Sequence, residues 1–294
     1  MAEARTAGAI YDLGYQRYGG VRRGRGSVIR TLLRFSFNTA FGIGRGQRSK
    51  TVPFLVCVVV YLPAIIQVAV ASASDGMIGI NYAQQLQLTA FLLALFAAAQ
   101  APELIVSDRQ QGVLSLYLSR PLRAMDYAIA KLGALVGAML VITLGPQLIL
   151  FLGKIALATS PLTVLKAEYT KLLPILGGTL LTSVFIASIG LLLASFATRR
   201  GYATASVIVF FLLAPAVVEM FRSVTSGDVK RYSTLAHPVY LITGFAGWLF
   251  DIEAKRRTAV GRADLPGQAY LWVMLAVSAF CTAMLIRRYR RMEA

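Results

Sequence analysis

Six long apolar runs, almost free of charged residues, dominate this sequence. They extend roughly over residues 52–73, 86–106, 127–152, 172–196, 203–221 and 269–286. A bilayer core about 30 Å thick requires about 20 apolar residues of helix. Because backbone groups in lipid must bond within their own segment, helices are the structures that such runs can form. The runs therefore predict an all-α polytopic membrane protein with six transmembrane helices.

The composition agrees with a chain that lies mostly in lipid. Hydrophobic residues make up 57% of the 294 residues and charged residues 15%, which is too apolar for a soluble domain of this size. None of the segments between the runs is long enough for a separate globular domain. We expect a basic tail at 1–51, a transmembrane domain at 52–286 and a second basic tail at 287–294.

The formal charge of +17 is concentrated in particular segments. Residues 1–51 contain ten basic and two acidic residues, and the basic tail after residue 286 and the Arg199–Arg200 pair lie on the same side if there are six spans. The positive-inside rule then predicts that both termini are cytoplasmic. We expect the basic tails to meet anionic lipid headgroups. Nucleic-acid binding by the Arg/Gly-rich stretch 17–25 is the alternative, and no other feature supports it.

A helix is expected at 27–41, just before the first span. Ser27 is a candidate N-cap, and an amphipathic helix here would lie in the membrane interface. Its polar stripe contains Arg30, Arg34 and Asn38, and its apolar residues are Ile29, Leu32, Leu33, Phe37 and Phe41.

The segment 222–268, between the fifth and sixth spans, contains an apolar stretch that is too short to cross a bilayer. This stretch covers 235–250 and is interrupted by Pro238, Gly244 and Gly247. A full span would also place the Arg-rich tail outside, against the charge rule. We therefore expect an extracellular re-entrant segment.

Common catalytic and binding motifs are not found. The stretch GRGQRSKT at 44–51 has Ser49 where a phosphate loop has its second glycine. His237 is the only histidine, which argues against His-based zinc sites and most general-base designs. Cys57 and Cys281 both fall in apolar runs, so neither a disulfide nor a reactive thiolate is indicated. We expect no catalytic residue, cofactor or metal site in this chain.

Charged residues within the spans are few. Glu103 and Glu219 lie near span ends, and Lys131 lies one turn into the third span, where it could extend to the cytoplasmic face. Ion-coupled carriers require intramembrane charge, and some channels have charged selectivity rings. The apolar interior argues against both classes.

The cytoplasmic stretch between the second and third spans predicts a short amphipathic helix over 107–119. Ser107 and Gln110 form a capping-box pattern, and Pro121 disfavours helix at the residue before it. On this interpretation the polar side consists of Asp108, Gln111, Ser115 and Ser119, and the remainder is covered by Val113, Leu114, Leu116, Tyr117 and Leu118.

The residues of this stretch resemble those of the type-2 ATP-binding-cassette (ABC) exporter permeases. The shared pattern is an acidic residue, a Gly-Val-Leu turn, a leucine followed by a proline (Leu-x-x-Pro here), a basic residue and a lysine opening the next span. Here these positions are Glu103, Gly112, Leu114, Leu118, Pro121, Arg123 and Lys131. With the six-span layout, the entry helix and the apolar dip, the resemblance covers about 27–291. The Gly/Arg/Tyr-rich amino-terminal tail departs from it.

The resemblance implies a permease that dimerises, with an identical or paralogous subunit, and binds two ATPase subunits that hold ATP and Mg²⁺. It implies a bacterial plasma membrane location and export along a path between the first, second and fifth spans. The short helix would be the coupling element that docks into the ATPase. The residues assigned to coupling are Glu103, Ser107, Asp108, Arg109, Gln110, Gly112, Val113, Leu114, Leu116, Tyr117, Leu118, Pro121 and Arg123.

The expected cargo is hydrophobic or amphipathic, because the path-lining spans contain little charge. Gln67, Gln87 and Gln100 are among their few polar groups. Three alternatives stay open: a secondary carrier or channel, a membrane-embedded enzyme, and a scaffold without transport. The first would need intramembrane charge or inverted repeats, and the second a cluster of His, Asp or Cys at span level.

Overall fold

The computed structural model describes residues 24–44, 46–74, 80–113, 122–252 and 258–293, and within them it contains helices and no strands. Six helices are long and apolar enough to cross a membrane, and each contains the whole of one predicted run. The prediction of six spans in an all-helical fold is therefore confirmed. The six are α2 (Gln47–Ala73), α3 (Tyr82–Gln110), α5 (Ala124–Ala156), α7 (Leu172–Phe196), α8 (Arg200–Val224) and α12 (Gly267–Glu293).

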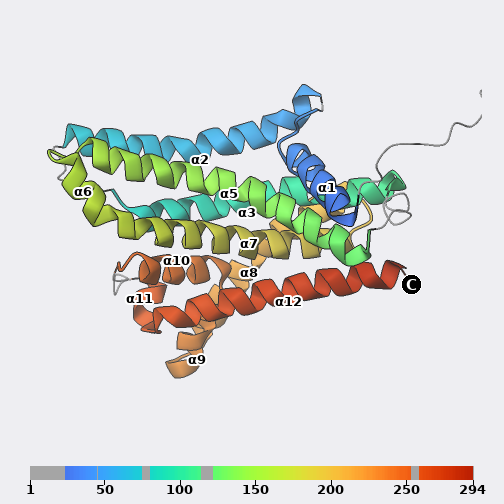
Figure 1. The fold of residues 1–294 in the computed structure, drawn as a ribbon. Coiled ribbons are helices and arrows are strands. Elements are labelled where there is room, and N and C mark those ends of the chain that lie inside the picture. Colours follow the sequence, from blue (N-terminus) through green and yellow to red (C-terminus); the bar gives the residue numbers. More distant parts are fainter. Residues whose placement is uncertain (1–23, 45, 75–79, 114–121, 253–257, 294) are drawn as a thin grey trace, which may run out of the picture.

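Shorter helices lie at the two ends of this bundle (Figure 1). One end carries α1 (Arg25–Ala40) and the carboxyl end of α12, and we name it the α1 end. The opposite end, named the α10 end, carries α6 (Pro161–Glu168), α10 (Pro238–Leu249) and α11 (Ala259–Ala263); α9 (Gly227–Tyr232) follows α8. Short 3₁₀ turns occur at Tyr169–Lys171 and Ser233–Ala236. The first described helix and the carboxyl end of the last thus lie at the same end of the bundle, as an even number of spans requires.

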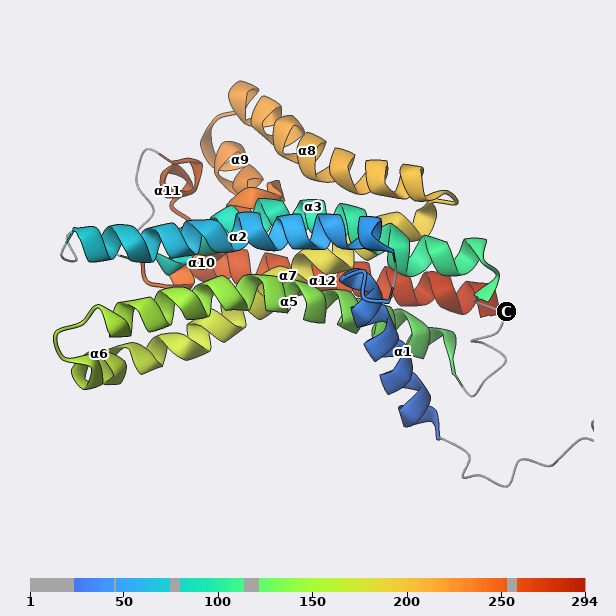
Figure 2. The same ribbon diagram turned by 90° about the horizontal axis from the view of Figure 1, so that it is seen from above.

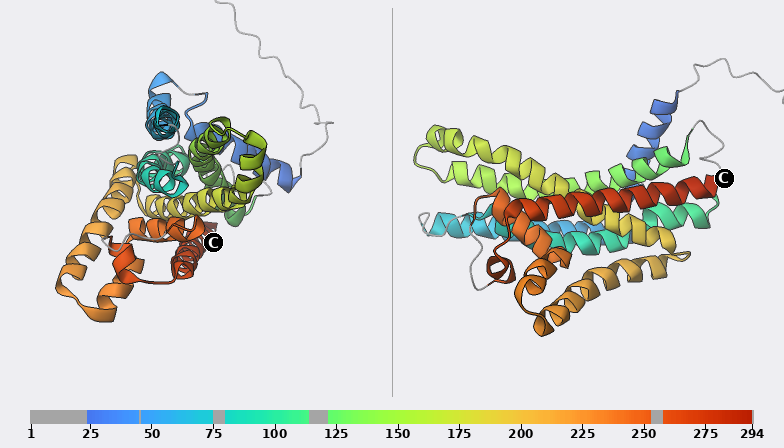
Figure 3. Two further views of the ribbon diagram at one scale, coloured as in Figure 1. Left: turned by 90° about the vertical axis from the view of Figure 1, so that its left-hand side faces the viewer. Right: turned by 90° about the horizontal axis from the view of Figure 1, so that it is seen from below.

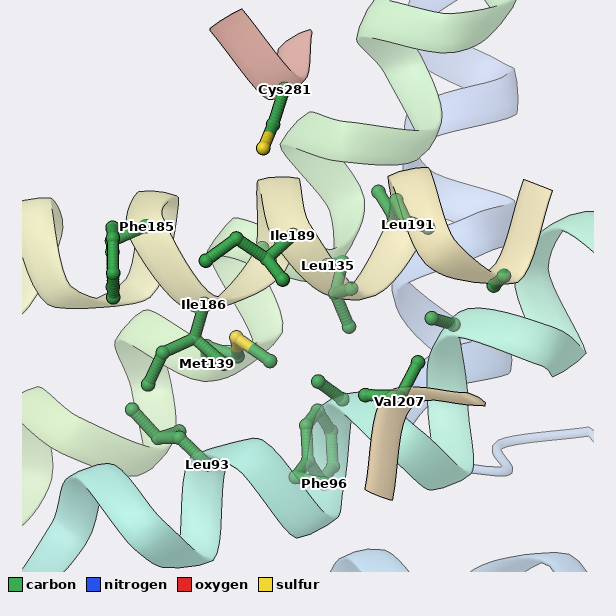
Figure 4. Close-up of a cluster of buried hydrophobic side chains, with 14 of the residues drawn as sticks. Leu93, Phe96, Leu135, Met139, Phe185, Ile186, Ile189, Leu191, Val207 and Cys281 are labelled. Carbon is green, nitrogen blue, oxygen red and sulfur yellow. The ribbon is translucent and has the colours of Figure 1, made fainter. Parts of the chain in front are cut away.

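Helices α3, α5 and α7 form the centre of the bundle. Figure 4 shows Leu93 and Phe96 of α3, Met139 of α5 and Ile186 and Ile189 of α7 packed together, all of them buried. By contrast, α2 and α8 expose most of their apolar side chains. In a membrane these outer faces meet lipid tails, so exposure costs them nothing.

Helix α1 packs along the first half of α5. A Cβ on Gly133 would lie 3.4 Å from Leu33 Cδ1, and one on Gly137 would lie 3.5 Å from the Phe37 ring. The pair of small residues therefore receives a helix of the same chain. The predicted helix is present, but its predicted cap is wrong: the N-cap is Gly24, and Ser27 lies in the first turn, where its carbonyl accepts from Thr31 Oγ1.

Helix α10 is the short apolar element expected before the last span. Its 12 residues extend about 18 Å, well short of a bilayer core. Its N-cap is His237, whose Nδ1 accepts the N–H of Tyr240 at 3.2 Å and whose ring stacks on that residue. Burial lowers the pKa of His237, which favours the neutral ring that this bond requires. The lone histidine thus serves a structural role.

Contact between α10 and α12 depends on Gly244. A Cβ there would lie 2.7 Å from the ring of Tyr270, which is buried. We expect Gly244→Ala to destabilise the protein by about 1–3 kcal/mol through overpacking, measured by thermal unfolding in detergent. The matched control is Gly177→Ala on α7, where a Cβ would meet no atom within 4 Å. Equal stability of the two variants would contradict this packing argument.

The orientation of the bundle in the membrane can be tested with single cysteines. Thr163 and Arg262 are exposed at the α10 end. In a variant lacking Cys57 and Cys281, cysteines at these two positions should react with impermeant thiol reagents from outside the cell. A cysteine at Ser115, which lies outside the described residues, should react only from the cytoplasm. Labelling of position 262 from the cytoplasm alone would mean that the predicted topology is wrong.

Candidate functional site

The connection between α3 and α5 begins differently from the sequence prediction. Helix α3 continues to Gln110, so Ser107 does not cap a new helix; its hydroxyl donates to Glu103 Oε2 at 3.3 Å within α3. Two residues beyond the end of α3, Gly112 has a φ of +66° and donates its N–H to the Arg109 carbonyl. A glycine in this left-handed conformation is a common helix terminator. The capping-box interpretation was therefore wrong: the predicted helix does not begin at Ser107, which lies inside α3, and residues 114–119 of the predicted helix lie outside the described ones.

A buried ion pair joins the last turns of α3 to α5. Lys131 Nζ lies 2.7 Å from Asp108 Oδ2, and its side chain is 2% exposed. The Tyr127 hydroxyl donates to the same oxygen at 2.9 Å, and the Tyr127 ring packs on that of Tyr289 of α12. Lys131 thus does not extend to the membrane surface as expected. Asp108 faces the bundle interior, not the polar side of a separate helix.

Two further side chains bind α3 to the start of α8. Glu103 Oε1 accepts from Arg200 Nη1 at 2.8 Å, in an ion pair that is partly exposed. Gln110 Nε2 donates to the Thr198 carbonyl at 3.2 Å. Both contacts lie at the α1 end, where α7 passes into α8. They fix the second span to the fifth at this level.

The carboxyl end of α7 is held by two arginines from neighbouring helices. Arg109 Nη1 donates to the carbonyl of Ser195 at 3.1 Å, and Arg288 Nε of α12 donates to the same carbonyl at 3.0 Å. The Arg288 guanidinium also lies 4.3 Å from the centre of the Phe196 ring. Cations are favourable at this position because the last carbonyls of a helix carry partial negative charge.

Helix α1 is fixed to the first turn of α5. Arg25 forms a two-point ion pair with Asp126, with N–O distances of 2.6 and 2.8 Å. Asp126 Oδ2 also accepts the backbone N–H of Arg123, the N-cap of α5. Arg123 is exposed, and its described bond is made by the backbone.

The predicted coupling residues therefore divide into three groups. Glu103, Ser107, Asp108, Arg109 and Gln110 come together in the last two turns of α3; three of them contact α5, α7 or α8, and Gln110 contacts the link between α7 and α8. Gly112, Val113 and Arg123 flank the connection itself. The remainder lie outside the described residues: Leu114, Leu116, Tyr117, Leu118 and Pro121.

The sequence analysis missed the partners Tyr127, Arg200 and Arg288. A signal was present for Arg200, which begins a span next to a second arginine. Nothing in the sequence links Asp108 to Lys131, because that pairing depends on the relative register of α3 and α5.

The three glutamines predicted to line a path are not brought together. Gln67 of α2 binds Gln85 of α3, with Nε2 3.0 Å from Oε1, and Gln85 donates to the Val60 carbonyl. Gln100 is buried further along α3, about 22 Å from Gln85 by helical rise, and Gln87 is partly buried. Gln85 is thus the polar residue that the sequence analysis overlooked.

Six apolar helices with internal polar contacts define the broad class. The molecule is a multi-pass helical membrane protein. No protein-family model matches the chain, and no curated protein matches it. Within the described ranges, no three His, Cys, Asp or Glu side chains are grouped so that they could hold a metal ion. The membrane class thus follows from the structure alone.

Proposed function

We propose that this chain is the transmembrane permease subunit of an ABC exporter. Two such subunits, identical or paralogous, would bind two separate ATPase subunits in which ATP and Mg²⁺ are held. The support is the resemblance of residues 103–131 to the type-2 ABC exporter permeases, together with the six spans, the entry helix α1 and the short helix α10. The proposed location is the bacterial plasma membrane, with both termini cytoplasmic.

One observation carries this proposal most directly: the segment 111–123 is bounded by two helices whose ends are bonded to the rest of the bundle. At its start, α3 binds α5 through Asp108, α7 through Arg109 and α8 through Glu103. At its end, α5 binds α1 through Asp126. A force applied to this segment by an ATPase would therefore reach four neighbouring helices through short polar contacts.

The proposed export path uses the face formed by α2, α3 and α8. Both α2 and α8 pack on α3, and Figures 2 and 3 show α8 on the outside of the bundle, diverging from it toward α9. Between α8 and α9 lies an apolar hollow of about 530 Å³ lined in part by Val217, Phe221 and Tyr232. The hollow is otherwise lined by apolar side chains and Ser233, with one carboxylate, Asp228, so these surfaces suit a hydrophobic or amphipathic cargo. Saturable vesicle transport of a small hydrophilic ion would contradict this choice of cargo.

The decisive experiment is purification of the tagged chain from its own membranes in a mild detergent. We expect recovery of a second protein with the phosphate-loop sequence that this chain lacks, in equal amount. After reconstitution in nanodiscs, the complex should hydrolyse ATP with inhibition by vanadate. A matched preparation of the tagged chain with Gly112→Pro tests whether hydrolysis depends on the connection between α3 and α5.

The buried Asp108–Lys131 pair bears on the competing hypothesis of a secondary carrier. Such carriers use intramembrane charges to couple ions to substrate. This pair, however, lies in the last turn of α3, next to the helix end at Gln110, and not at mid-span. Transport by the purified chain alone, driven by an ion gradient without ATP and abolished by Asp108→Asn, would favour the carrier and overturn the proposal.

A further inference from the structure

A pocket of about 460 Å³ lies at the α1 end, where α3, α7 and α12 meet, and its lining is strongly basic. Figure 1 shows the ends of these helices close to the carboxyl terminus. Of the residues that line the pocket, only Arg109 was assigned to coupling by the sequence analysis. It is lined by Arg109, Phe196, Met284, Arg287, Arg288 and Arg291.

Two of the four arginines are held in place by the protein. Arg109 and Arg288 both donate to the Ser195 carbonyl, and Arg288 also packs on the Phe196 ring. Each of these bonds uses only part of a guanidinium that has five N–H donors. In the part of the chain that the structure describes, no carboxylate pairs with any of the four arginines. The pocket therefore retains positive charge and oriented donors.

Such a pocket is suited to a phosphate group. Arginine recognises phosphate oxygens through paired, charge-assisted N–H bonds that fix both distance and direction. Arg109 and Arg288 come from different helices and converge on one carbonyl, so their remaining N–H groups lie near one another. Arg287 and Arg291 are exposed at the rim and are separated by one turn on α12.

The chemistry next to the pocket distinguishes a lipid phosphate from a free one. Phe280 and Met284 precede Arg288 at four-residue intervals on α12, so they lie on the same side of the helix, two turns and one turn nearer the bilayer centre respectively. Phe280 is 63% exposed. This gradation from apolar to basic matches an acyl chain below a headgroup. Basic pockets between spans are known sites for anionic headgroups.

We propose that this pocket binds the phosphate of an anionic phospholipid, with an acyl chain lying against Phe280 and Met284. The bound lipid would join α12 to α3 and α7 at their ends. This site is independent of the proposed transport function, because it requires only a membrane-embedded chain. It also differs from general attraction of the basic tails to the membrane surface, because it requires four particular side chains.

The test uses the full chain, delipidated in detergent and titrated with phosphatidylglycerol, phosphatidylcholine or inorganic phosphate, with binding followed by native mass spectrometry. The variant Arg287→Gln/Arg291→Gln removes two pocket cations that make no described bond to the protein. We expect it to bind phosphatidylglycerol about thirtyfold more weakly, given a contribution of about 1 kcal/mol from each arginine at a lipid surface. The matched control is Arg30→Gln/Arg34→Gln, which removes two exposed cations from α1 at the same end and should bind as the wild type does.

Each outcome decides the proposal. Tight phosphatidylglycerol binding by the wild type, weak phosphatidylcholine binding and loss in the pocket variant alone would support it. Equal binding of the two lipids would show that the phosphate pocket does not select anionic lipid. Equal loss in the α1 variant would show diffuse attraction instead of a site. Displacement of phosphatidylglycerol by millimolar inorganic phosphate would identify a free-anion site and overturn the lipid assignment.

Discussion

Replacing Lys131 by methionine is expected to destabilise the protein by about 3–5 kcal/mol, because it leaves Asp108 buried without its cation. The two charges lie 2.7 Å apart, and the lysine side chain is 2% exposed. The Tyr127 hydroxyl, which also donates to Asp108, cannot replace the lost charge. Unfolding in mixed detergent and sodium dodecyl sulfate, followed by Trp248 and Trp272 fluorescence, would measure the loss.

The matched control for this change is Lys154→Met at the α10 end. Lys154 forms an ion pair of similar length with Glu168, 2.6 Å, but its side chain is 39% exposed. Because the Lys154 side chain stays partly in water in the folded protein, we expect a smaller cost than for Lys131→Met, although Glu168 is only 13% exposed. The double variant Asp108→Asn/Lys131→Met should recover much of the stability, since no unpaired charge remains. Equal costs for Lys131→Met and Lys154→Met would show that burial does not govern the first pair.

The second large effect is expected in the connection between α3 and α5, and it rests on the proposed function. Leu116→Asp and Leu118→Asp should each weaken binding of the ATPase subunit roughly a thousandfold, because an unpaired carboxylate would be buried in its cleft. Ser119→Asp adds the same charge on the predicted polar side and should leave assembly intact. Recovery of the complex on an affinity column and its ATP hydrolysis would be compared for the three variants.

An alternative to docking is that this segment only rests on the membrane surface. In that case the leucine variants would loosen its contact with lipid and leave the ATPase complex unchanged. Gly112→Pro separates assembly from coupling, because proline cannot adopt the φ of +66° found there. It should disturb the end of α3 and reduce substrate-stimulated hydrolysis while part of the complex still forms. Normal assembly and stimulation in both aspartate variants would contradict the coupling role.

The spans were predictable from the sequence because a helix that crosses lipid must be apolar over most of its length. The whole of each apolar run is therefore found inside one helix, as for 172–196 and α7. The short length of α10 followed from the same argument. Neither result depended on how the helices pack against one another.

Local signals near helix ends were less informative. The pattern Ser107-x-x-Gln110 is compatible with a helix start, but here the preceding apolar run carries α3 through it. Ser27 failed in the same way, since α1 begins two residues earlier, at Arg25. A capping pattern identifies a helix start only when the residues before it leave the helical conformation.

The contacts that make up the candidate site depend on tertiary register, which hydropathy does not contain. Lys131 was expected at the membrane surface because its partner is 23 residues away in the sequence, in another helix. Gln85 was overlooked because the sequence alone does not distinguish it from Gln84 and Gln87. Only the packing of α2 on α3 brings Gln85 opposite Gln67.

The bond between Arg25 and Asp126 has a consequence for biosynthesis. Its two residues are 101 positions apart, and at about 5–20 residues per second the ribosome needs roughly 5–20 s to pass from one to the other. During that time α1 has been made, but α5, with the glycines that receive it, has not. An amphipathic helix can wait at the lipid interface without a protein partner. The apolar side chains of α1 that later contact α5 would thus first be shielded by lipid, and membrane insertion of the third span would release them to their final position.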